Sequence, residues 1–547
     1  MNKVKPAFRR PRTKQPPRRI LFFTRLAAAR GRFRNPAMRR LTSTLLLALI
    51  PVGFLVLTVA APLWALAAYG GDLAWAEVLG DDYIRRRIAW TAAQAGITCV
   101  LTVLLGVPVA WTLARLDFRG RSWVLRLLML PFVMPTLVAG IGVLSLFGAR
   151  GLLWPGWQDT PYLLVYGNVF FNLPVLVRAA YQGLRAVPAA RLSAARTLGA
   201  DAWQRFWRVE CPVLLPWLAG GACLVFLYCF SGFGLALLLG GTDYATAEVE
   251  IYRLVTVELD IAQAGVLVWL VLGVTALAGA AYAYFGRASA AGRQVAPQPL
   301  AAVDSAARRA MLFFSLAVLA FFCVLPLAAV AAQAARSGES WQVLWAEDTR
   351  LAAWNTLRFT ASAAAAALLL GASHAALARR LPWIRGITFL PFMVSPVCVA
   401  FGMLLLYPEW TASLPLLIAA YALLAYPFVT KDLLAAWDAL PPQYAAAARS
   451  MGASRFQTAF FVTVPLLLPA LRRGLTLAAA TCIGEFAATL FLSRPEWLTL
   501  TTLVYQYLGA AGADNHDRAA VLTAALMLLA SLVFVLLDAA EKRETAR

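Results

Sequence analysis

The sequence predicts an all-α polytopic membrane protein with about 12 transmembrane helices, arranged as two parallel repeats of six helices. Three observations support this prediction: 61% hydrophobic residues against 14% charged ones, many apolar runs near the roughly 20 residues that cross a bilayer, and an internal repeat. Soluble domains usually contain about 45–50% apolar and about 25% charged residues. A β-barrel is excluded because its strands alternate apolar and polar residues and contain no continuous apolar runs.

Twelve apolar segments are long enough to be membrane-spanning helices. We place them at residues 41–68, 88–114, 123–148, 162–184, 212–240, 262–285, 310–335, 353–378, 386–408, 413–430, 465–493 and 519–537. Their number predicts six helices in each half of the chain.

The net charge of +22 is divided unevenly between the two sides of the predicted membrane. The side that holds both termini takes 39 of the 49 Lys and Arg residues and 9 of the 27 acidic residues. Because basic residues stay in the cytoplasm during insertion, both termini are predicted to be cytoplasmic. The charge therefore indicates topology and not binding to nucleic acid. Residues 1–40 contain no acid and are predicted to form a basic cytoplasmic tail attracted to lipid.

Two stretches of the chain occur twice. LPFVMPTLVAGIGVLSLF at 130–147 is mirrored by LPFMVSPVCVAFGMLLLY at 390–407, and AARTLGADAWQRFWRVECPVLLP at 194–216 by AARSMGASRFQTAFFVTVPLLLP at 447–469. Because each half holds an even number of helices, the two halves are expected to face the same way. The predicted division is a first repeat at 41–285, a cytoplasmic linker at 286–309, a second repeat at 310–540 and a C-terminal tail at 541–547.

The second of these stretches predicts a helix–glycine–helix elbow on the cytoplasmic side. Pro188 can begin a helix, and Gly199 interrupts it as a left-handed turn would. Asp201 is the expected N-cap of a second short helix, and Pro212 is expected to open the next span. In the second copy Pro441, Gly452 and Pro465 occupy the same places.

An elbow of this composition suits docking into a groove on another protein. Small alanine side chains permit close approach, while Arg196 and Arg449 can each form a forked polar contact. Two gapless copies argue against an ordinary amphipathic loop helix. The candidate docking residues are Ala194, Ala195, Arg196, Gly199, Asp201, Pro212, Ala447, Ala448, Arg449, Gly452 and Pro465.

Both segments resemble the EAA loops of ABC-importer permeases, in which Glu-Ala-Ala is followed by a glycine and then, after an aliphatic pair, by a proline. The first copy matches with Ser193-Ala194-Ala195, Gly199 and Pro212; the second matches with Ala446-Ala447-Ala448, Gly452 and Pro465. Neither copy has the leading glutamate, which puts in doubt any role carried over from that residue.

The resemblance implies a type I, MetI-like permease fold in the bacterial inner membrane. In that family the coupling loops, here 188–212 and 441–465, sit in clefts of two ATP-binding subunits, and a periplasmic binding protein delivers the solute. The doubled chain resembles the fused permeases, most of all those for thiamine, in the segments 169–184, 237–254 and 499–510. The implied solute is thiamine or its phosphate esters.

Two alternatives remain open at this stage. A ferric-iron importer also has a fused permease, so that the solute is not fixed. A secondary transporter with 12 helices would share the parallel halves, but such a protein has no use for the elbow.

The chain is predicted not to be an enzyme. A P-loop needs a lysine that follows a glycine, and no lysine here does so. We therefore expect no cofactor in this chain, with ATP and Mg²⁺ used by the partner ATPase. Seven cysteines without a Cys-x-x-Cys pair, and two histidines, predict no metal site.

Glu485 is the clearest acidic residue inside a predicted span. Charges within a membrane are costly and are functional candidates by default. We interpret Glu485 as a candidate for the translocation path, where it could attract a cation. The alternative is a helix–helix hydrogen bond or a contact near the outer interface.

Overall fold

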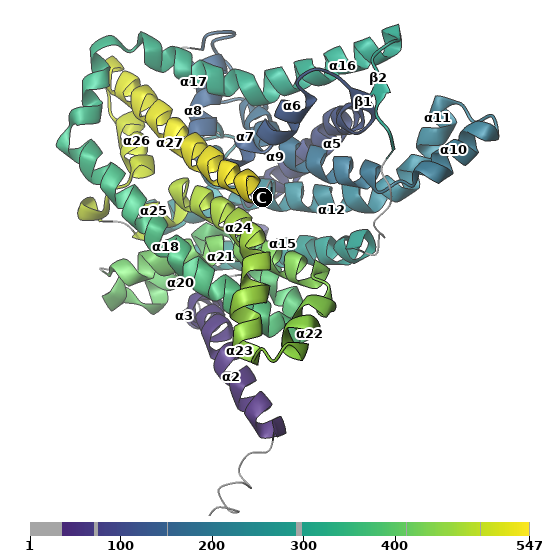
Figure 1. Cartoon of the computed structure of the whole chain (residues 1–547). Helices are drawn as coiled ribbons and strands as arrows, with labels where there is room; N and C mark the ends of the chain where they lie inside the picture. The colour runs from purple at the N-terminus through teal and green to yellow at the C-terminus, as the bar shows by residue number, and fades with distance from the viewer. Residues whose placement is uncertain are drawn as a thin grey trace, which may run out of the picture.

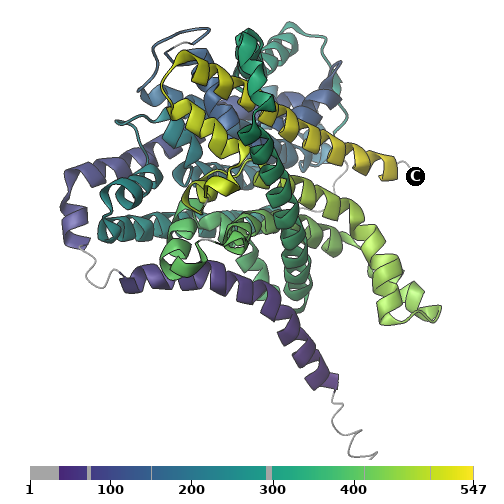
Figure 2. The same cartoon turned by 90° about the vertical axis from the view of Figure 1, so that its left-hand side faces the viewer.

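The computed structural model describes residues 36–69, 75–149, 151–290, 298–411, 413–492 and 494–545. It confirms the predicted all-α class, because the described residues are mostly helical and contain only two strands of two residues each (Figures 1 and 2). Ten helices in these ranges are long and apolar enough to cross a membrane. The predicted tails at 1–40 and 541–547 and the linker at 286–309 lie partly outside the described residues.

The elements of the two halves follow the same order, with η marking turns of π- or 3₁₀-helix. The first half contains α2 (Pro36–Leu55), η1 (Val56–Ala60), α3 (Ala61–Tyr69), α4 (Trp75–Gly80), α5 (Asp82–Arg115), β1 (Leu116–Asp117), α6 (Arg121–Leu127), α7 (Leu130–Val133), α8 (Thr136–Phe147), α9 (Pro161–Arg185), α10 (Ala189–Thr197), α11 (Ala202–Arg205), η2 (Phe206–Glu210), α12 (Cys211–Phe230), α13 (Gly234–Leu239), α14 (Ala247–Arg253), η3 (Leu254–Glu258) and α15 (Ile261–Ala290).

The remainder of the chain begins with a short strand that pairs in parallel with β1. It contains β2 (Ala301–Ala302), α16 (Ala306–Leu319), η4 (Ala320–Val324), α17 (Leu325–Arg336), η5 (Gly338–Trp345), α18 (Glu347–Arg380), η6 (Pro382–Phe389), α19 (Leu390–Met393), α20 (Pro396–Leu406), η7 (Pro408–Trp410), α21 (Leu414–Ala439), α22 (Pro442–Ser450), α23 (Arg455–Thr458), η8 (Ala459–Thr463), α24 (Val464–Ile483), α25 (Ala487–Leu492), η9 (Pro495–Trp497), α26 (Leu500–Gly509) and α27 (Ala513–Thr545).

The first helix of each half packs on the other half. The unit α2–η1–α3 contacts α18 and α20, and the unit α16–η4–α17 contacts α5 and α8 (Figure 1). The same close approach occurs twice: Gly142 in α8 lies against Pro326, and Gly402 in α20 lies against Pro62. A Cβ atom at Gly142 would lie 2.7 Å from the carbonyl oxygen of Pro326, so only glycine fits there. The two halves are therefore interlocked.

A turn of π-helix ends two residues before a proline at four places in the described chain. The turns η1, η2, η4 and η8 precede Pro62, Pro212, Pro326 and Pro465. A proline inside an α-helix lacks the N–H and clashes with the carbonyl four residues earlier. The wider π-turn, with bonds five residues apart, relieves this clash. The helix therefore continues through each of these prolines.

This arrangement corrects one detail of the sequence analysis. Pro212 and Pro465 do not open the fifth span of each half. The second elbow helix runs without interruption into the membrane, as one helix from Ala202 to Phe230 and, in the second half, one from Arg455 to Ile483. Each elbow is thus continuous with a helix that is long and apolar enough to cross a membrane.

The third predicted span of each half, 123–148 and 386–408, is broken in the structure. The first contains two helical parts, 121–133 and 136–147, bent by 99°. The breaks fall at Pro135 and at Ser395, where Pro396 follows. A residue before proline is forced out of the helical region, and Met134 and Ser395 both adopt extended backbone, with ψ of 142° and 140°.

The fifth predicted span of each half, 212–240 and 465–493, is also shorter than expected. The long helices α12 and α24 end at Phe230 and Ile483, and short helices α13 and α25 follow after three-residue breaks. The breaks contain Gly232 and Gly484, which favour helix termination. Glu485 therefore lies in a helix break and not within a continuous span.

Candidate functional site

A cavity of about 260 Å³ lies between the two halves of the molecule. All four helix breaks reach it. Its wall consists of Phe132, Val133, Met134, Pro135, Thr136, Asn168, Phe171, Asn172, Tyr228, Ser231, Gly232, Phe233, Gly234 and Leu235 from the first half, and of Pro391, Val394, Pro396, Leu424, Phe428, Leu477, Ala480, Thr481, Gly484, Glu485, Phe486 and Ala487 from the second. Irregular backbone at membrane depth is tolerated where it lines such a cavity.

The breaks of the two halves contact each other beside this cavity. Phe233 and Phe486 occupy equivalent positions in the repeat and stack with ring centroids 6.1 Å apart. A Cβ atom at Gly484 would lie 2.9 Å from Cα of Pro135 in the other half. Within the first half, a Cβ atom at Gly234 would lie 2.6 Å from Oγ1 of Thr136. The two halves therefore pack closely at Gly484 and Pro135, beside the cavity.

Glu485 lines the cavity, and its side chain also has a structural role. The residue is 9% exposed, and its Oε1 accepts the backbone N–H of Ala488 at 2.8 Å, which caps the start of α25. The equivalent position in the first half is Gly232. The cavity thus has one carboxylate among its lining residues. Its side-chain hydrogen bond to Ala488 is a local cap and not a bond to another helix, and its role in a translocation path stays a prediction.

Six aromatic rings and two amides also line the cavity. Asn168 donates to Gln94 Oε1 at 2.7 Å, and Asn172 donates to the carbonyl of Asn168 at 2.9 Å, while Oδ1 of Asn172 has no hydrogen-bond partner among the described residues. The aromatic members are Phe132, Phe171, Tyr228, Phe233, Phe428 and Phe486. The cavity wall thus combines one carboxylate with six aromatic rings.

Sequence reasoning did not find these aromatic and amide residues. The prolines at 135 and 396 and the glycines at 232 and 484 carry the sequence signature of the breaks. Prolines and glycines interrupting apolar segments at corresponding positions of two halves indicate where a transporter binds its solute. That pattern could have located the cavity wall before the structure.

A second buried carboxylate links the two halves near the cavity. Glu248 in α14 is fully buried and accepts a hydrogen bond from Ser395 Oγ at 2.5 Å. Ser395 in turn accepts from the backbone N–H of Val397 at 3.1 Å and caps α20. The sequence analysis missed Glu248, because an acidic residue in a short segment between spans gives no indication of its burial.

The first elbow has the predicted helix–glycine–helix shape. Gly199 adopts φ +78°, its N–H donates to the carbonyl of Arg196 at 3.0 Å, and Ala200 donates to Ala195 at 2.9 Å. This is the glycine turn that ends many helices. Asp201 then caps α11, accepting the N–H of Gln204 at 2.7 Å in a reciprocal capping box.

The second elbow reproduces this geometry. Gly452 adopts φ +90°, its N–H donates to Arg449 at 3.1 Å, and Ala453 donates to Ala448 at 3.1 Å. Ser454 caps α23 in a second capping box with Gln457. Both elbows stand out from the body of the molecule, at α10–α11 and at α22–α23 (Figure 1). The local shape predicted from the repeat is thus present in both halves.

The outer surfaces of the elbows carry both arginine side chains and large apolar side chains. Arg196 and Arg449 are exposed, and so are Ala194 and Ala447, whereas Ala195 is partly buried and Ala448 is buried. Large apolar side chains are exposed at matching positions. In the first elbow Leu198, Trp203 and Trp207 are 86%, 70% and 50% exposed, and in the second Met451, Phe456 and Phe460 are 82%, 76% and 56% exposed. Exposed apolar surface of this kind is typical of a protein-binding site.

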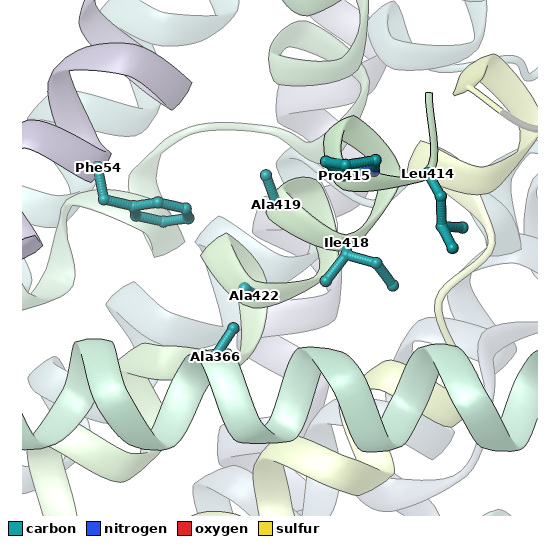
Figure 3. Close-up of a pocket in the computed structure, with 7 residues that line it drawn as sticks. All are labelled: Phe54, Ala366, Leu414, Pro415, Ile418, Ala419 and Ala422. Carbon is teal, nitrogen blue, oxygen red and sulfur yellow. The ribbon is translucent and has the colours of Figure 1, made fainter. Parts of the chain in front are cut away.

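A second pocket, of about 400 Å³, is lined by apolar side chains (Figure 3). It lies where α2, the first helix of the first half, packs on the second half. Phe54 of α2 points toward Ala419 and Ala422 of α21, and Ala366 of α18 closes it from below. Its lining contains no polar side chain, so it offers no group for recognising a polar solute.

The chain belongs to the family of binding-protein-dependent transport system inner membrane components, whose model matches twice, at residues 102–290 and 363–545. It is therefore a fused, double-length permease of the ABC-importer class, and the alternative of a secondary transporter is wrong.

The chain is similar over most of its length to permeases named for thiamine transport. It is 28% identical to the thiamine transport system permease protein ThiP of Haemophilus influenzae over 517 residues, covering 89% of this chain and 94% of the relative. It is 28% identical to ThiP of Brucella abortus over 540 residues, covering 93% and 97%. The sulfate transport system permease protein CysW of Synechococcus elongatus is 28% identical over 203 residues, 36% of this chain and 71% of that protein.

Proposed function

We propose that this chain forms the translocation path for thiamine or its phosphate esters across the bacterial inner membrane. The observation that carries the proposal is the cavity between the halves, which combines one carboxylate, Glu485, with six aromatic side chains. Thiamine carries a permanent positive charge on an aromatic ring, and aromatic faces with a nearby carboxylate stabilise such a cation. The near full-length similarity to thiamine permeases supports the same solute.

The partners follow from the family and from the elbows. Two ATP-binding subunits, which use ATP and Mg²⁺, would each receive one elbow through its exposed apolar and arginine side chains. A periplasmic binding protein would deliver the solute to the opposite face. The excess of basic residues on the side of the elbows supports a cytoplasmic position for the elbows and for both termini.

Substitution Glu485→Gln tests the role of the carboxylate. Glutamine keeps an oxygen that can accept the N–H of Ala488, so the cap of α25 is retained while the charge is removed. The full chain, with its ATPase and binding protein, is placed in proteoliposomes, and ATP-dependent uptake of labelled thiamine is measured. We expect uptake to fall about tenfold, which corresponds to a loss of roughly 1.4 kcal/mol.

Glu339→Gln is the matched control, because it makes the same chemical change at an exposed residue outside the cavity wall. We expect this variant to transport within about twofold of the unmodified chain. Uptake of ferric iron in place of thiamine by the unmodified chain would contradict the proposed solute. Unchanged thiamine uptake by Glu485→Gln would contradict the proposed role of the carboxylate.

A further inference from the structure

Arg115, the last residue of α5, lies at the base of the first elbow. The residue is 7% exposed, and its Nη2 donates to Oε1 of Glu210 at 3.0 Å and to the carbonyl oxygen of Leu184 at 3.1 Å. Glu210 is 5% exposed. A buried ion pair of this kind stabilises little by itself, but the loss of one partner leaves an uncompensated charge.

The two acceptor residues lie on the two stems of the elbow, which are the helix that enters it and the helix that leaves it. Leu184 is next to the last residue of α9, which leads into the elbow, and Glu210 ends η2, through which the elbow continues into α12. One guanidinium from a third helix therefore holds the entry and the exit of the elbow together. Three membrane-spanning helices, α5, α9 and α12, meet at this contact.

The second elbow has no equivalent ion pair among the described residues. Arg379 occupies the position of Arg115 in the repeat, but it is exposed and lies over the ring of Trp437, 4.9 Å from the centroid. Thr463 occupies the position of Glu210, and its Oγ1 donates at 3.4 Å to Thr458 within the same helix. Arg379 thus contacts the entry stem alone.

The base of the first elbow is also attached to the segment that joins the halves. Directly after Arg115, Leu116 and Asp117 of β1 pair with Ala301 and Ala302 of β2. The strand β2 precedes α16, the helix that packs across on the first half (Figure 1). The contact at Arg115 therefore lies where the first elbow, the first helix bundle and the inter-repeat segment meet.

We propose that Arg115 and Glu210 are positioning residues that make the first elbow a rigid lever, so that movement imposed at its tip turns the bundle of α5, α9 and α12 as one body. At the equivalent positions of the second elbow, Arg379 lies over Trp437 of the entry stem and Thr463 is uncharged, so this ion pair is absent there. The two elbows of the fused chain are then mechanically unequal. This inference rests on the proposed function as an ATP-driven permease.

The test measures coupling and not only activity. Full-length chain carrying Glu210→Gln is assembled with the ATPase subunits and the binding protein in proteoliposomes, and the amount of thiamine taken up per ATP hydrolysed is determined. We expect this ratio to fall at least about fivefold, since coupling between distant sites is commonly of that size. The control Thr463→Ala, at the equivalent place in the second elbow, should keep the ratio within about twofold.

A merely structural role gives a different result. If uptake and hydrolysis decline together in Glu210→Gln and their ratio is unchanged, the inference is overturned. Arg115→Lys provides a second variant that keeps the buried positive charge but replaces the planar fork by a single ammonium. It should assemble with the ATPase and again lower the ratio; assembly with a normal ratio would also overturn the inference.

The outcomes separate this inference from the proposed function. Absence of ATP-dependent thiamine uptake by the unmodified chain would overturn both. Normal uptake by the unmodified chain, together with an unaltered ratio in both variants, would overturn the lever alone and leave the permease function in place.

Discussion

The two elbow glycines give the sharpest test of docking to the ATPase. Gly199 and Gly452 adopt φ values of +78° and +90°, and each donates its N–H to the carbonyl three residues earlier. Proline fixes φ near −65° and has no N–H. The double variant Gly199→Pro, Gly452→Pro must therefore rotate each turn by roughly 140° or more and lose both hydrogen bonds.

The free-energy cost of the proline substitutions can be compared with that of alanine at the same two positions. Alanine at either position meets no atom within 4 Å of its Cβ, so its cost is the backbone strain alone, about 1–2 kcal/mol per site. Proline costs about 3 kcal/mol or more, which reduces the population of a correctly shaped elbow by more than about a hundredfold. We therefore expect a graded loss of binding from glycine to alanine to proline.

The assay is co-purification of the ATPase subunits with the tagged full-length chain in detergent. We expect the double proline variant to insert into the membrane in normal amounts and to retain almost no ATPase. Gly156→Pro is the control, because Gly156 also has positive φ and open surroundings but lies in the loop between α8 and α9, outside the elbows. Normal ATPase recovery with the double proline variant would refute the docking role of the elbows.

Three further predictions follow from other contacts. Asp201→Ala removes the capping box of α11 and should weaken ATPase binding by about 1 kcal/mol, measured as an increase in Kd. Gly484→Ala brings a Cβ atom to 2.9 Å from Pro135 and should reduce the free energy of unfolding by about 1–3 kcal/mol, seen as a lower Tm of the purified protein. Gly273→Ala is the control, because a Cβ atom there meets open space and should leave the Tm unchanged. Equal Tm values for the two variants would contradict the close contact between the halves. Trp203→Ser with Phe456→Ser removes exposed apolar surface from both elbows and should raise the Kd for the ATPase by at least about fivefold without changing membrane insertion, and an unaltered Kd would show that these side chains do not dock.

The repeat made the elbows predictable from sequence. Helix, glycine turn and cap are local structures, decided by residues within a few positions of each other. Gly199 and Asp201 specify the first turn by their own backbone and side-chain preferences, and Gly452 and Ser454 do so in the second. The structure agrees with the shape of both elbows, while their docking to an ATPase stays a prediction.

Hydropathy correctly identified the apolar segments but overlooked their interruptions. The segments 123–148 and 465–493 are apolar over most of their length and therefore resemble continuous spans. In the structure their helices break at Pro135 and Gly484. A window average over roughly 20 residues cannot register a single proline or glycine. Pro212 is expected from the sequence to begin a new helix, but the π-turn η2 accommodates this proline and the helix continues through it.

The amino-acid sequence by itself determined the membrane class, the doubling of the chain, the elbows and the family, because composition, repetition and turn chemistry act locally along the chain. The tertiary structure decided which residues face one another across the halves. The cavity around Glu485 and the bond from Ser395 to Glu248 join positions separated by more than a hundred residues. Such contacts depend on how the interlocked bundles pack, and no periodicity within one segment encodes the partner in another.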